Sequence, residues 1–409
     1  MATLKGFRDF SQNQMALRKA VLTQIVSVFE KYGFTELQTP ALEYQEVLLG
    51  KYGPEAEKLM YLFNDPGERA VGLKYDLTVP LARYVSENRD IPLPFKRYQI
   101  QPVYRAENTQ KGRYREFFQC DVDIVGVKTP ASDAEILAVI SDCFTALKFP
   151  DYTVQVNSRP VLFEIMERAN VEKDKWLSAI QSIDKLDKKS TDEVQGELNE
   201  KGFSQTQIVE IFASLKTAKP DNYLTQVLNM AEKLGAKNIQ FNPAISRGLD
   251  YYDGPIFETI VHEPKIGSVT GGGRYDGLLK ALGGPDLPAV GTTIGLERII
   301  DVIEELGLWA DMKLQTTTAL VTVFGDEFMD QSIEVTKLLR EHGTNAELYL
   351  DGNAKIEKQL KYADKKNIPF VIIVGADEIA QKVIRVKNMV ERSEQIVSHE
   401  DLAHGHLPF

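Results

Sequence analysis

The sequence changes in texture along the chain, and this succession restricts the folds that the chain can adopt. Residues 95–127 and 239–294 have the apolar patterns and turn residues of strands, but residues 160–234 between them are poor in Gly and dense in Lys and Glu. Runs of β-branched residues are absent from that middle stretch, which indicates helices. We therefore expect a sheet domain that is interrupted by a helical insertion. Near the N-terminus, apolar residues at helical spacing predict a helix at about residues 11–31, and a strand-like run follows at residues 34–39.

The C-terminal part of the chain alternates between strands and helices. Strands are expected at residues 319–324, 346–350 and 370–375, and helices at residues 326–342 and 354–366. This order predicts a small α/β domain, joined to the rest by a linker near residues 311–318. The predicted fold class is thus α+β, with an antiparallel sheet flanked by helices, a helical insertion and a C-terminal α/β domain. The predicted domain ranges are 1–159, 160–236, 237–312 and 318–409.

Composition excludes several classes of protein. The 409 residues are 43% hydrophobic and 26% charged, which is typical of a folded globular chain but too long for one ordinary core. No apolar stretch approaches the roughly 18 residues of a membrane helix, and no secretion signal is recognisable. Cys120 and Cys143 are too few for a disulfide framework. The net charge of −11 disfavours a general coating of nucleic acid. We expect a cytoplasmic protein with no membrane partner.

The densest polar cluster spans residues 104–119, on two expected strands around a turn at residues 107–112. If the second arm is a strand, its period of two places on one face Arg113, Arg115, Phe117, Gln119, Asp121 and Asp123. The opposite face, which would pack on the core, then carries Tyr114, Phe118, Val122 and Ile124. Guanidinium groups bind phosphate through two hydrogen bonds, and an aromatic ring can stack on a base. Such a face suits a nucleotide and a polar small molecule. A solvated sheet face with ion pairs is an equally good interpretation of the spacing.

Three further segments are unusual. Residues 245–254 combine Arg, Asp and paired Tyr, which could hydrogen-bond an imidazole, although ordinary turn packing is the simpler interpretation. Residues 271–277 are Gly-rich but match neither common phosphate loop, so they indicate a close backbone approach to a ligand or another strand. Residues 291–298 pass from a strand into a helix, with Arg298 in the first turn, where N–H groups favour anions.

Taken in order, these segments resemble a class II aminoacyl-tRNA synthetase, and specifically the histidyl-tRNA synthetase family, over nearly the whole chain. Residues 5–9 (Lys-Gly-Phe-Arg-Asp) resemble the N-terminal signature of that family, and residues 33–40, 105–119 and 291–298 resemble motifs 1, 2 and 3 of the class. Residues 247–252 are similar to the element that distinguishes histidyl enzymes. The resemblance implies a six-stranded antiparallel class II sheet, an anticodon-binding C-terminal domain and, through motif 1, a homodimer.

The resemblance also implies roles for individual residues. As catalytic residues, Arg105 would contact the ATP α-phosphate and the histidine carboxylate, and Arg247 would stabilise negative charge at that phosphate. The implied ATP-binding residues are Arg105, Glu107, Arg113, Phe117 and Arg298. The implied histidine-binding residues are Asp76, Thr78, Arg105, Gln119, Asp123, Arg247, Tyr251, Tyr252 and Tyr275. Strand parity does not separate Asp121 from Asp123. Mg²⁺ would bridge the outer phosphates of ATP, and no residue set predicts a metal held by the protein alone.

The implied reaction joins histidine and ATP to form histidyl-adenylate and then transfers histidine to the 3′ end of tRNA(His). One alternative is the non-catalytic regulatory subunit of ATP phosphoribosyltransferase, a relative that typically lacks the C-terminal domain and the reactive arginines. Another is a stress-sensing module that binds uncharged tRNA, where the ATP site would be eroded. The sequence keeps the four arginines that the enzyme would need, which favours the enzyme; they are Arg105, Arg113, Arg247 and Arg298. A helical lysine stripe could contact tRNA phosphates, although most such stripes are solvated; it comprises Lys355, Lys358, Lys361 and Lys365.

Overall fold

The computed structural model of the chain describes residues 2–49, 57–246, 252–309 and 317–406. It divides into two compact units, one of residues 1–10 and 18–310 and the other of residues 11–17 and 311–409. Two predicted site residues, Arg247 and Tyr251, and most of the predicted linker lie outside the described residues. Within the described ranges, no helix has the length and apolar character needed to cross a membrane.

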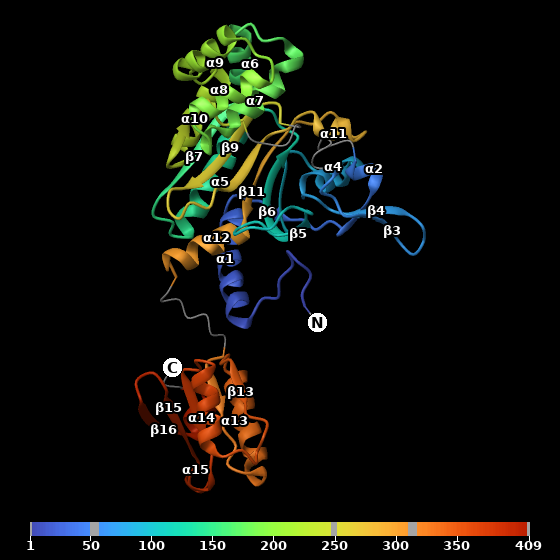
Figure 1. Cartoon of the computed structure of the whole chain (residues 1–409). Helices are drawn as coiled ribbons and strands as arrows, with labels where there is room; N and C mark the ends of the chain where they lie inside the picture. Colours follow the sequence, from blue (N-terminus) through green and yellow to red (C-terminus); the bar gives the residue numbers. More distant parts are fainter. Residues whose placement is uncertain (1, 50–56, 247–251, 310–316, 407–409) are drawn as a thin grey trace. The chain divides into compact units, whose positions relative to one another are not determined.

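The first unit is built on an eight-stranded sheet with the order β1-β5-β6-β11-β10-β9-β7-β8 (Figure 1). Its strands are β1 (Thr35–Glu36), β5 (Phe95–Tyr104), β6 (Glu116–Val125), β7 (Tyr152–Ser158), β8 (Ile239–Phe241), β9 (Pro255–Val261), β10 (Ser268–Arg274) and β11 (Ala289–Gly295). From β5 to β7 all neighbours are antiparallel, whereas β1 and β8 pair in parallel with β5 and β7. The expected six antiparallel strands are therefore extended by a short parallel strand at each edge.

The β5–β6 hairpin carries the polar cluster. Its ladder runs from the pair Phe95–Val125 to the pair Tyr104–Glu116, so the connecting turn covers residues 105–115. The shared face of Phe117, Gln119, Asp121 and Asp123 lies within β6, as predicted. The prediction that this face extends back through Arg113 and Arg115 is wrong, because both precede the strand. A bridge between Gln110 and Arg113 and a positive φ of 71° at Gly112 reverse the chain there instead.

Helices flank this sheet. They are α1 (Gln12–Lys31), α4 (Thr78–Glu87), α5 (Pro130–Ala146), α11 (Leu278–Ala281) and α12 (Leu296–Leu306). Helix α5 packs against β6, β7 and β11, and α12 packs against β6 and β11. Beside α4, the short helix α2 (Gln45–Leu48) adjoins a second sheet of β2 (Leu42–Tyr44), β4 (Ala70–Leu73) and β3 (Leu62–Asn64). The strand expected over residues 34–39 is reduced to β1.

The stretch with helical texture forms a group of helices beyond β7 and β9 (Figure 1). Its elements are α6 (Arg159–Arg168), η1 (Lys173–Lys175), α7 (Trp176–Ile183), η2 (Asp184–Asp187), α8 (Thr191–Glu200), α9 (Gln205–Thr217) and α10 (Asn222–Lys233). Ser190 and Ser204 begin α8 and α9 with capping boxes, which satisfy amides that a helix start leaves unpaired. The buried apolar side chains of α6, α7, α8 and α9 form one cluster that also includes Ile245 and Ile256 of the sheet region, whereas α10 packs against α5.

The second unit is a small α/β domain with the strand order β13-β12-β14-β15-β16. Its elements are β12 (Ala319–Val321), η3 (Asp326–Phe328), α13 (Met329–Glu341), β13 (Ala346–Leu348), α14 (Ile356–Lys365), β14 (Phe370–Ile373), α15 (Ala376–Gln381), β15 (Val383–Asn388), β16 (Ser393–Ser398) and α16 (His399–Ala403). Strands β12, β13 and β14 are parallel, and the predicted alternation of strand and helix is confirmed for them. The antiparallel β15–β16 hairpin was not predicted, because β16 is polar and mostly exposed.

Candidate active site

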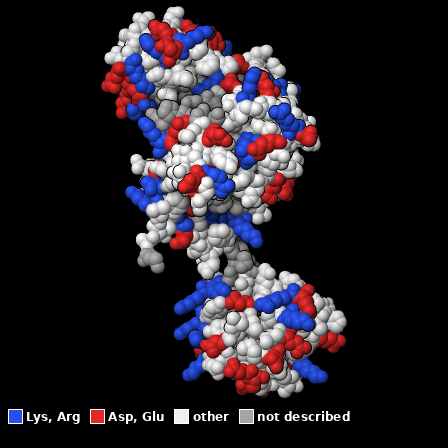
Figure 2. Space-filling model, turned by 90° about the vertical axis from the view of Figure 1, so that its right-hand side faces the viewer, with Lys and Arg blue, Asp and Glu red and all other residues white. Residues whose placement is uncertain are grey.

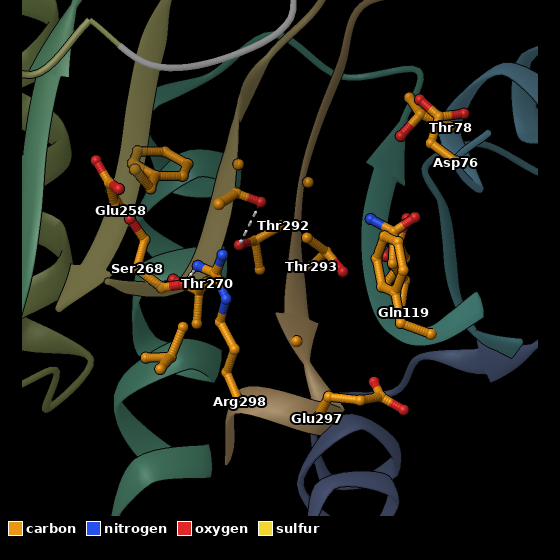
Figure 3. Close-up of a pocket in the computed structure, with 18 of the residues that line it drawn as sticks. Asp76, Thr78, Gln119, Glu258, Ser268, Thr270, Thr292, Thr293, Glu297 and Arg298 are labelled. Atoms are coloured by element: carbon orange, nitrogen blue, oxygen red, sulfur yellow. Dashed lines mark hydrogen bonds between the residues drawn. The ribbon is translucent and has the colours of Figure 1, made fainter. Parts of the chain in front are cut away.

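A cavity of about 370 Å³ lies in the first unit, against strands β6, β9, β10 and β11 (Figure 3). The turn before β6, the residues around the start of α4 and the first turn of α12 complete its wall. Its lining residues are Asp76, Thr78, Arg105, Glu107, Gly112, Arg113, Tyr114, Phe117, Gln119, Asp121, Asp123, Tyr252, Phe257, Glu258, Ser268, Val269, Thr270, Gly271, Gly272, Tyr275, Gly291, Thr292, Thr293, Gly295, Glu297 and Arg298.

Every predicted site residue within the described ranges lines this cavity. These residues come from distant parts of the sequence, since Asp76 precedes α4, Gln119 lies on β6 and Arg298 lies in α12. In Figure 3, Asp76 and Thr78 lie on one side of the cavity and Glu258 and Ser268 on the other. The remaining predicted residues, Arg247 and Tyr251, lie outside the described residues.

Arg105 enters the cavity directly after β5. Its Nε donates a hydrogen bond to the carbonyl oxygen of Tyr75 at 3.0 Å. Its guanidinium carbon lies 4.3 Å from the centre of the Tyr75 ring and 5.2 Å from that of Phe117. Two aromatic faces and a carbonyl therefore fix the direction of this cation, and such a fixed fork is suited to phosphate or carboxylate oxygens.

Two further arginines approach from the turn and from α12. Arg298 donates from Nε to the carbonyl oxygen of Gly112 at 3.2 Å and from Nη1 to that of Ser268. Figure 3 shows this side chain extending from α12 along the strands toward Ser268. Nη1 of Arg113 lies 3.7 Å from Oε2 of Glu107, which is too long for more than a loose ion pair. Together with Arg105 they make the cavity a favourable site for several negative oxygens.

The cavity also holds buried carboxylates. Oδ1 of Asp76 accepts a hydrogen bond from the amide of Val79 at 3.1 Å, which holds Asp76 at the start of α4. On β6, Asp123 accepts a hydrogen bond from the hydroxyl of Tyr275, and its Oδ2 lies 2.8 Å from Nη2 of Arg97. Arg97 and Asp123 are both almost fully buried. Asp123 is thus held in place by a hydrogen bond on Oδ1 and an ion pair on Oδ2.

Burial dominates the electrostatics of these acids. It raises the pKa of Asp121 to about 7, with the charge of Asp123 adding to the effect and Arg97 opposing it. It also raises the pKa of Asp123, against Arg97 and the hydroxyl of Tyr275. Burial lowers the pKa of the neighbouring Lys74 to about 8, although the charges of nearby acids oppose this. One buried guanidinium shared by two buried acids leaves a surplus of negative charge that a cationic ligand group would stabilise.

Some polar atoms of the cavity have no hydrogen-bond partner. They are Oε1 of Gln119, Oδ1 of Asp121, Oγ1 of Thr293 and Oδ2 of Asp123, whose contact with Arg97 is an ion pair, and all four are buried. These residues lie on the adjacent strands β6 and β11, where Asp121 is directly opposite Thr293. A buried polar atom without a partner costs about 1–3 kcal/mol. A ligand with N–H or O–H donors would recover this cost, which is how a site built for one polar ligand rejects others.

Glycines let the strands approach each other beneath the cavity. A Cβ atom on Gly272 would lie 2.3 Å from the carbonyl oxygen of Gly291, and one on Gly291 would lie 1.9 Å from Oδ1 of Asp123. A Cβ atom on Gly271 would meet nothing within 4 Å, because Gly271 faces the cavity. The hydroxyl of Thr292 donates to the carbonyl oxygen of Gly271 at 3.3 Å (Figure 3). The Gly-rich segment therefore lets β10 approach β11 closely at Gly272 and leaves the cavity open at Gly271.

Sequence reasoning missed several residues of the wall. Glu258 lies in the mostly apolar strand β9 and is 6% exposed. An acid among apolar neighbours was the sequence signal that could have indicated a buried functional carboxylate. Glu297 directly precedes Arg298 and is buried, with Nη2 of Arg18 donating to it at 2.9 Å. Tyr114 was assigned to the opposite, core-facing side of the strand, but it lies in the turn and lines the cavity. Strand period has no meaning in a turn.

Comparison with known proteins places the chain in a family. The family model described as "Histidyl-tRNA synthetase" matches residues 6–299, and the one described as "Anticodon binding domain" matches residues 318–405. The histidine–tRNA ligase of Cytophaga hutchinsonii is 38% identical, with 98% of each chain covered. That of Aeropyrum pernix is 42% identical, with 91% of this chain and 90% of the relative covered.

Solved structures agree with these sequence relatives. The crystal structure of histidyl-tRNA synthetase from Nostoc sp. PCC 7120 matches with a TM-score of 0.83 and 30% identity, with 98% of both chains covered. A structure titled as an ATP phosphoribosyltransferase regulatory subunit/histidyl-tRNA synthetase, from Bacillus halodurans, matches with a TM-score of 0.76 over 92% of this chain and 99% of that one. Its identity is 19%, so it shares the fold. The chain has the class II fold with an anticodon-binding domain, and it belongs to the histidyl-tRNA synthetase family.

Proposed function

We propose that this chain is a histidine–tRNA ligase, which activates histidine with ATP and then transfers histidine to the 3′ end of tRNA(His). One observation carries the proposal. A single cavity contains three arginines, Arg105, Arg113 and Arg298, together with the buried acids Asp76 and Asp123. A triphosphate and an amino acid with cationic groups require these opposite charges in one place.

The first step forms histidyl-adenylate. A carboxylate oxygen of histidine attacks the α-phosphorus of ATP, the new P–O bond forms, and the bond to pyrophosphate breaks. Because both reacting groups are negative, fixed cations must screen them and hold them in line. Arg105 has this role in the proposal, supported by the aromatic rings and carbonyl that fix its direction. Arg247 is proposed as a second cation at the α-phosphate.

The second step transfers the amino acid. A hydroxyl of the terminal ribose of the tRNA attacks the acyl carbon of the adenylate, the new ester bond forms, and AMP leaves with the electrons of the acyl–phosphate bond. The hydroxyl loses its proton as the ester forms. No covalent enzyme intermediate is required, so positioned cations and hydrogen-bond donors supply the catalysis.

The proposed ATP contacts come from the turn before β6 and from α12. Arg113 and Arg298 hold the outer phosphates, Phe117 stacks on adenine, and Glu107 accepts a hydrogen bond from the adenine amino group. All four residues line the cavity, and the loose pairing of Arg113 with Glu107 leaves both side chains able to turn toward a ligand. A planar guanidinium can bind two phosphate oxygens at once.

The proposed histidine contacts come from the acidic part of the cavity. The α-ammonium group would be held by Asp76, Thr78 and Gln119. The imidazole would be read by Asp123, Tyr251, Tyr252 and Tyr275. Supporting this, Asp123 and Tyr275 already share a hydrogen bond, and the rings of Tyr252 and Tyr275 meet edge to face with centres 6.4 Å apart. A side chain that left these buried groups unpaired would be strongly rejected.

Mg²⁺ would enter bound to the outer phosphates of ATP. Protein sites for this ion commonly add one or two carboxylates to phosphate oxygens. Glu258 supplies that chemistry, because its buried carboxylate lines the cavity on the side of Ser268 and Arg298 (Figure 3). The donor set therefore fits an ion held jointly by the substrate and Glu258. The ion would add positive charge between the outer phosphates.

The tRNA partner is proposed to contact the C-terminal unit as well as the cavity. Figure 2 shows several Lys and Arg side chains together along one edge of that unit. The lysine stripe Lys355, Lys358, Lys361 and Lys365 lies on or next to α14. Nζ of Lys358 lies 3.5 Å from Oδ2 of Asp351. Because this ion pair is exposed, a phosphate group could take the place of Asp351 at little cost in free energy. The stripe could thus contact tRNA phosphates, with the salt dependence typical of such contacts.

A homodimer in the cytoplasm is also proposed. The sheet β2-β4-β3 exposes large apolar side chains on its two outer strands, namely Leu42, Tyr44, Leu62 and Phe63. Apolar side chains grouped in this way favour a protein partner, and a second copy of the chain is the partner that motif 1 implies. Light scattering after gel filtration should show the mass of a dimer. A fully active monomer would contradict this part of the proposal.

ATP–pyrophosphate exchange without tRNA tests the catalytic proposal directly. Exchange is expected with histidine and with no other standard amino acid. Arg247→Ala should reduce the exchange rate by about 100-fold or more, the size of effect seen when one donor to a developing charge is removed. Near-normal exchange by that variant would exclude its assigned role. If the wild-type chain exchanged with no amino acid, a regulatory subunit of ATP phosphoribosyltransferase would be the better interpretation.

A further inference from the structure

The N-terminal segment, residues 5–10, lies against the turn that carries the proposed ATP contacts. The carbonyl oxygen of Gly6 accepts a hydrogen bond from the amide of Arg115 at 2.9 Å. The Arg115 side chain then donates to the carbonyl oxygens of Glu107 at 3.2 Å and Lys5 at 3.5 Å. Arg115 therefore ties the backbone of the N-terminal segment to the backbone of Glu107 in the turn.

Gly6 can have no side chain at this contact. Its φ of 89° is in the region that favours glycine. A Cβ atom there would also lie 2.6 Å from Cγ of Arg115 and 2.9 Å from Cγ2 of Thr109. The N-terminal segment is thus packed against both arms of the turn, which is a closer fit than a loose terminal arm would need.

Arg8 makes the second contact. Its guanidinium carbon lies 3.2 Å from the centre of the Tyr114 ring, and its Nη2 lies 3.6 Å from Oε1 of Glu297. Nε and Nη2 of Arg8 are buried without a hydrogen-bond partner. The ring and the carboxylate therefore supply the stabilisation of this cation. Arg8 does not line the cavity, whereas Tyr114 and Glu297 both do.

Glu297 connects three elements at this point. Oε1 accepts a hydrogen bond from Arg18 of α1 at 2.9 Å, and Oε2 accepts one from the amide of Phe118 on β6 at 3.0 Å. Figure 3 shows Glu297 at the start of α12, directed toward α1 and away from Arg298. Because Arg298 is the next residue, a shift of Glu297 would move the side chain that reaches the outer phosphates.

We propose that Arg8 is a positioning residue for ATP, acting through Tyr114 and Glu297 to hold the turn at residues 105–115 at a fixed spacing from Arg298. The proposal rests on the proposed function. Arg8 has no contact with Asp76 or Asp123 among the interactions of the described residues. The N-terminal segment would therefore affect the binding of ATP far more than that of histidine.

Steady-state exchange kinetics separate these effects. Arg8→Gln should raise the KM for ATP roughly ten-fold, as expected for the loss of one partly desolvated cation–aromatic contact and one ion pair, while the KM for histidine stays within roughly two-fold. Arg8→Lys should recover much of the loss, because a cation remains near the Tyr114 ring and Glu297. Thr3→Ala, just before this segment, is the control, since Thr3 is exposed and its hydroxyl donates to Asp9.

The outcomes distinguish three cases. Equal rises in both KM values, or no rise in either, with an unchanged melting temperature, would overturn the positioning role. If Arg8→Gln does not fold, Arg8→Lys decides alone: a selective rise in the KM for ATP supports the role and unchanged constants refute it. If the wild-type chain itself shows no histidine-dependent exchange, the proposed function fails before the role of Arg8 is tested.

Discussion

Replacing Asp121 by Asn should change how the stability of this protein depends on pH. Asp121 is 3% exposed, and burial raises its pKa to about 7, with Asp123 and Asp76 adding to this effect and the Arg97 charge opposing it. Lys74 lies near enough to interact with the same carboxylate. Asn has nearly the same shape and does not titrate, so the substitution removes the proton equilibrium and little of the packing.

The sign follows from the proton count. In the unfolded chain the carboxyl releases its proton near its ordinary pKa of 3.8, whereas the native protein keeps it until about pH 7. Between these values the native state binds more protons, so the free energy of unfolding falls as pH rises. A pKa raised from 3.8 to about 7 corresponds to about 4 kcal/mol, at about 1.4 kcal/mol for each pKa unit. Removing the neighbouring charge also eases the ionisation of Asp123, which acts in the same direction.

The assay is urea unfolding of both proteins, without ligands, at several values from about pH 5 to about pH 8. The variant should gain stability relative to the wild type as pH rises, by a few kcal/mol across this range. Asp286→Asn is the control, since Asp286 is an exposed acid paired with Lys280. Two curves that stay parallel across the range would refute the reasoning, because Asp121 would then titrate alike in the native and unfolded states.

Three further predictions follow from single contacts. Gly291→Ala should destabilise the protein by about 1–3 kcal/mol, because its Cβ would lie 1.9 Å from Oδ1 of Asp123. Gly271→Ala is the control and should leave the stability unchanged, because a Cβ there would meet nothing within 4 Å. Equal melting temperatures for the two variants would contradict the prediction. Arg274→Lys should lower the free energy of unfolding in urea by about 3 kcal/mol. The buried guanidinium of Arg274 donates to both carboxylate oxygens of Asp133, at 3.1 and 2.5 Å, and Lys cannot make both bonds. An unchanged urea midpoint would contradict this prediction. The double change of Lys358 and Lys361 to Glu should weaken tRNA binding and flatten its salt dependence, and unchanged affinity would dismiss the lysine stripe.

Local patterns were sufficient for most elements of the fold. Helix α1, the β5–β6 hairpin and the alternation in the C-terminal unit all follow from periods of apolar residues along short stretches. Their ends were less well predicted where another element competes. The strand expected at residues 34–39 keeps only β1, because its backbone pairing with β5 ends at Leu37, whose amide donates to the carbonyl oxygen of Tyr98. The turn at residues 105–115 is longer than predicted for the same kind of reason, since its arms bind the N-terminal segment.

The residue types of the site were recognisable from the sequence and its family resemblance, but their partners were not. Glu258 and Thr293 gave little warning, because an acid or hydroxyl within a strand can face solvent, core or ligand. Tyr114 was assigned to the core side by a period that ends where the strand ends. Each of these errors concerns a direction that is set by neighbouring strands distant in sequence, such as the pairing of β6 with β11.

The sequence by itself determined the class of fold, the order of its elements and the residue types that a nucleotide and an amino acid need, because periodicity and motif spacing are local properties. It did not separate Asp121 from Asp123, since two residues apart on a strand always share a face. The tertiary structure separated them. It brings Arg97 and the hydroxyl of Tyr275 to Asp123 and leaves Oδ1 of Asp121 buried without a hydrogen-bond partner. Burial and the nearest charges decide what a carboxyl group does, and both depend on strands and loops that meet only in the folded chain.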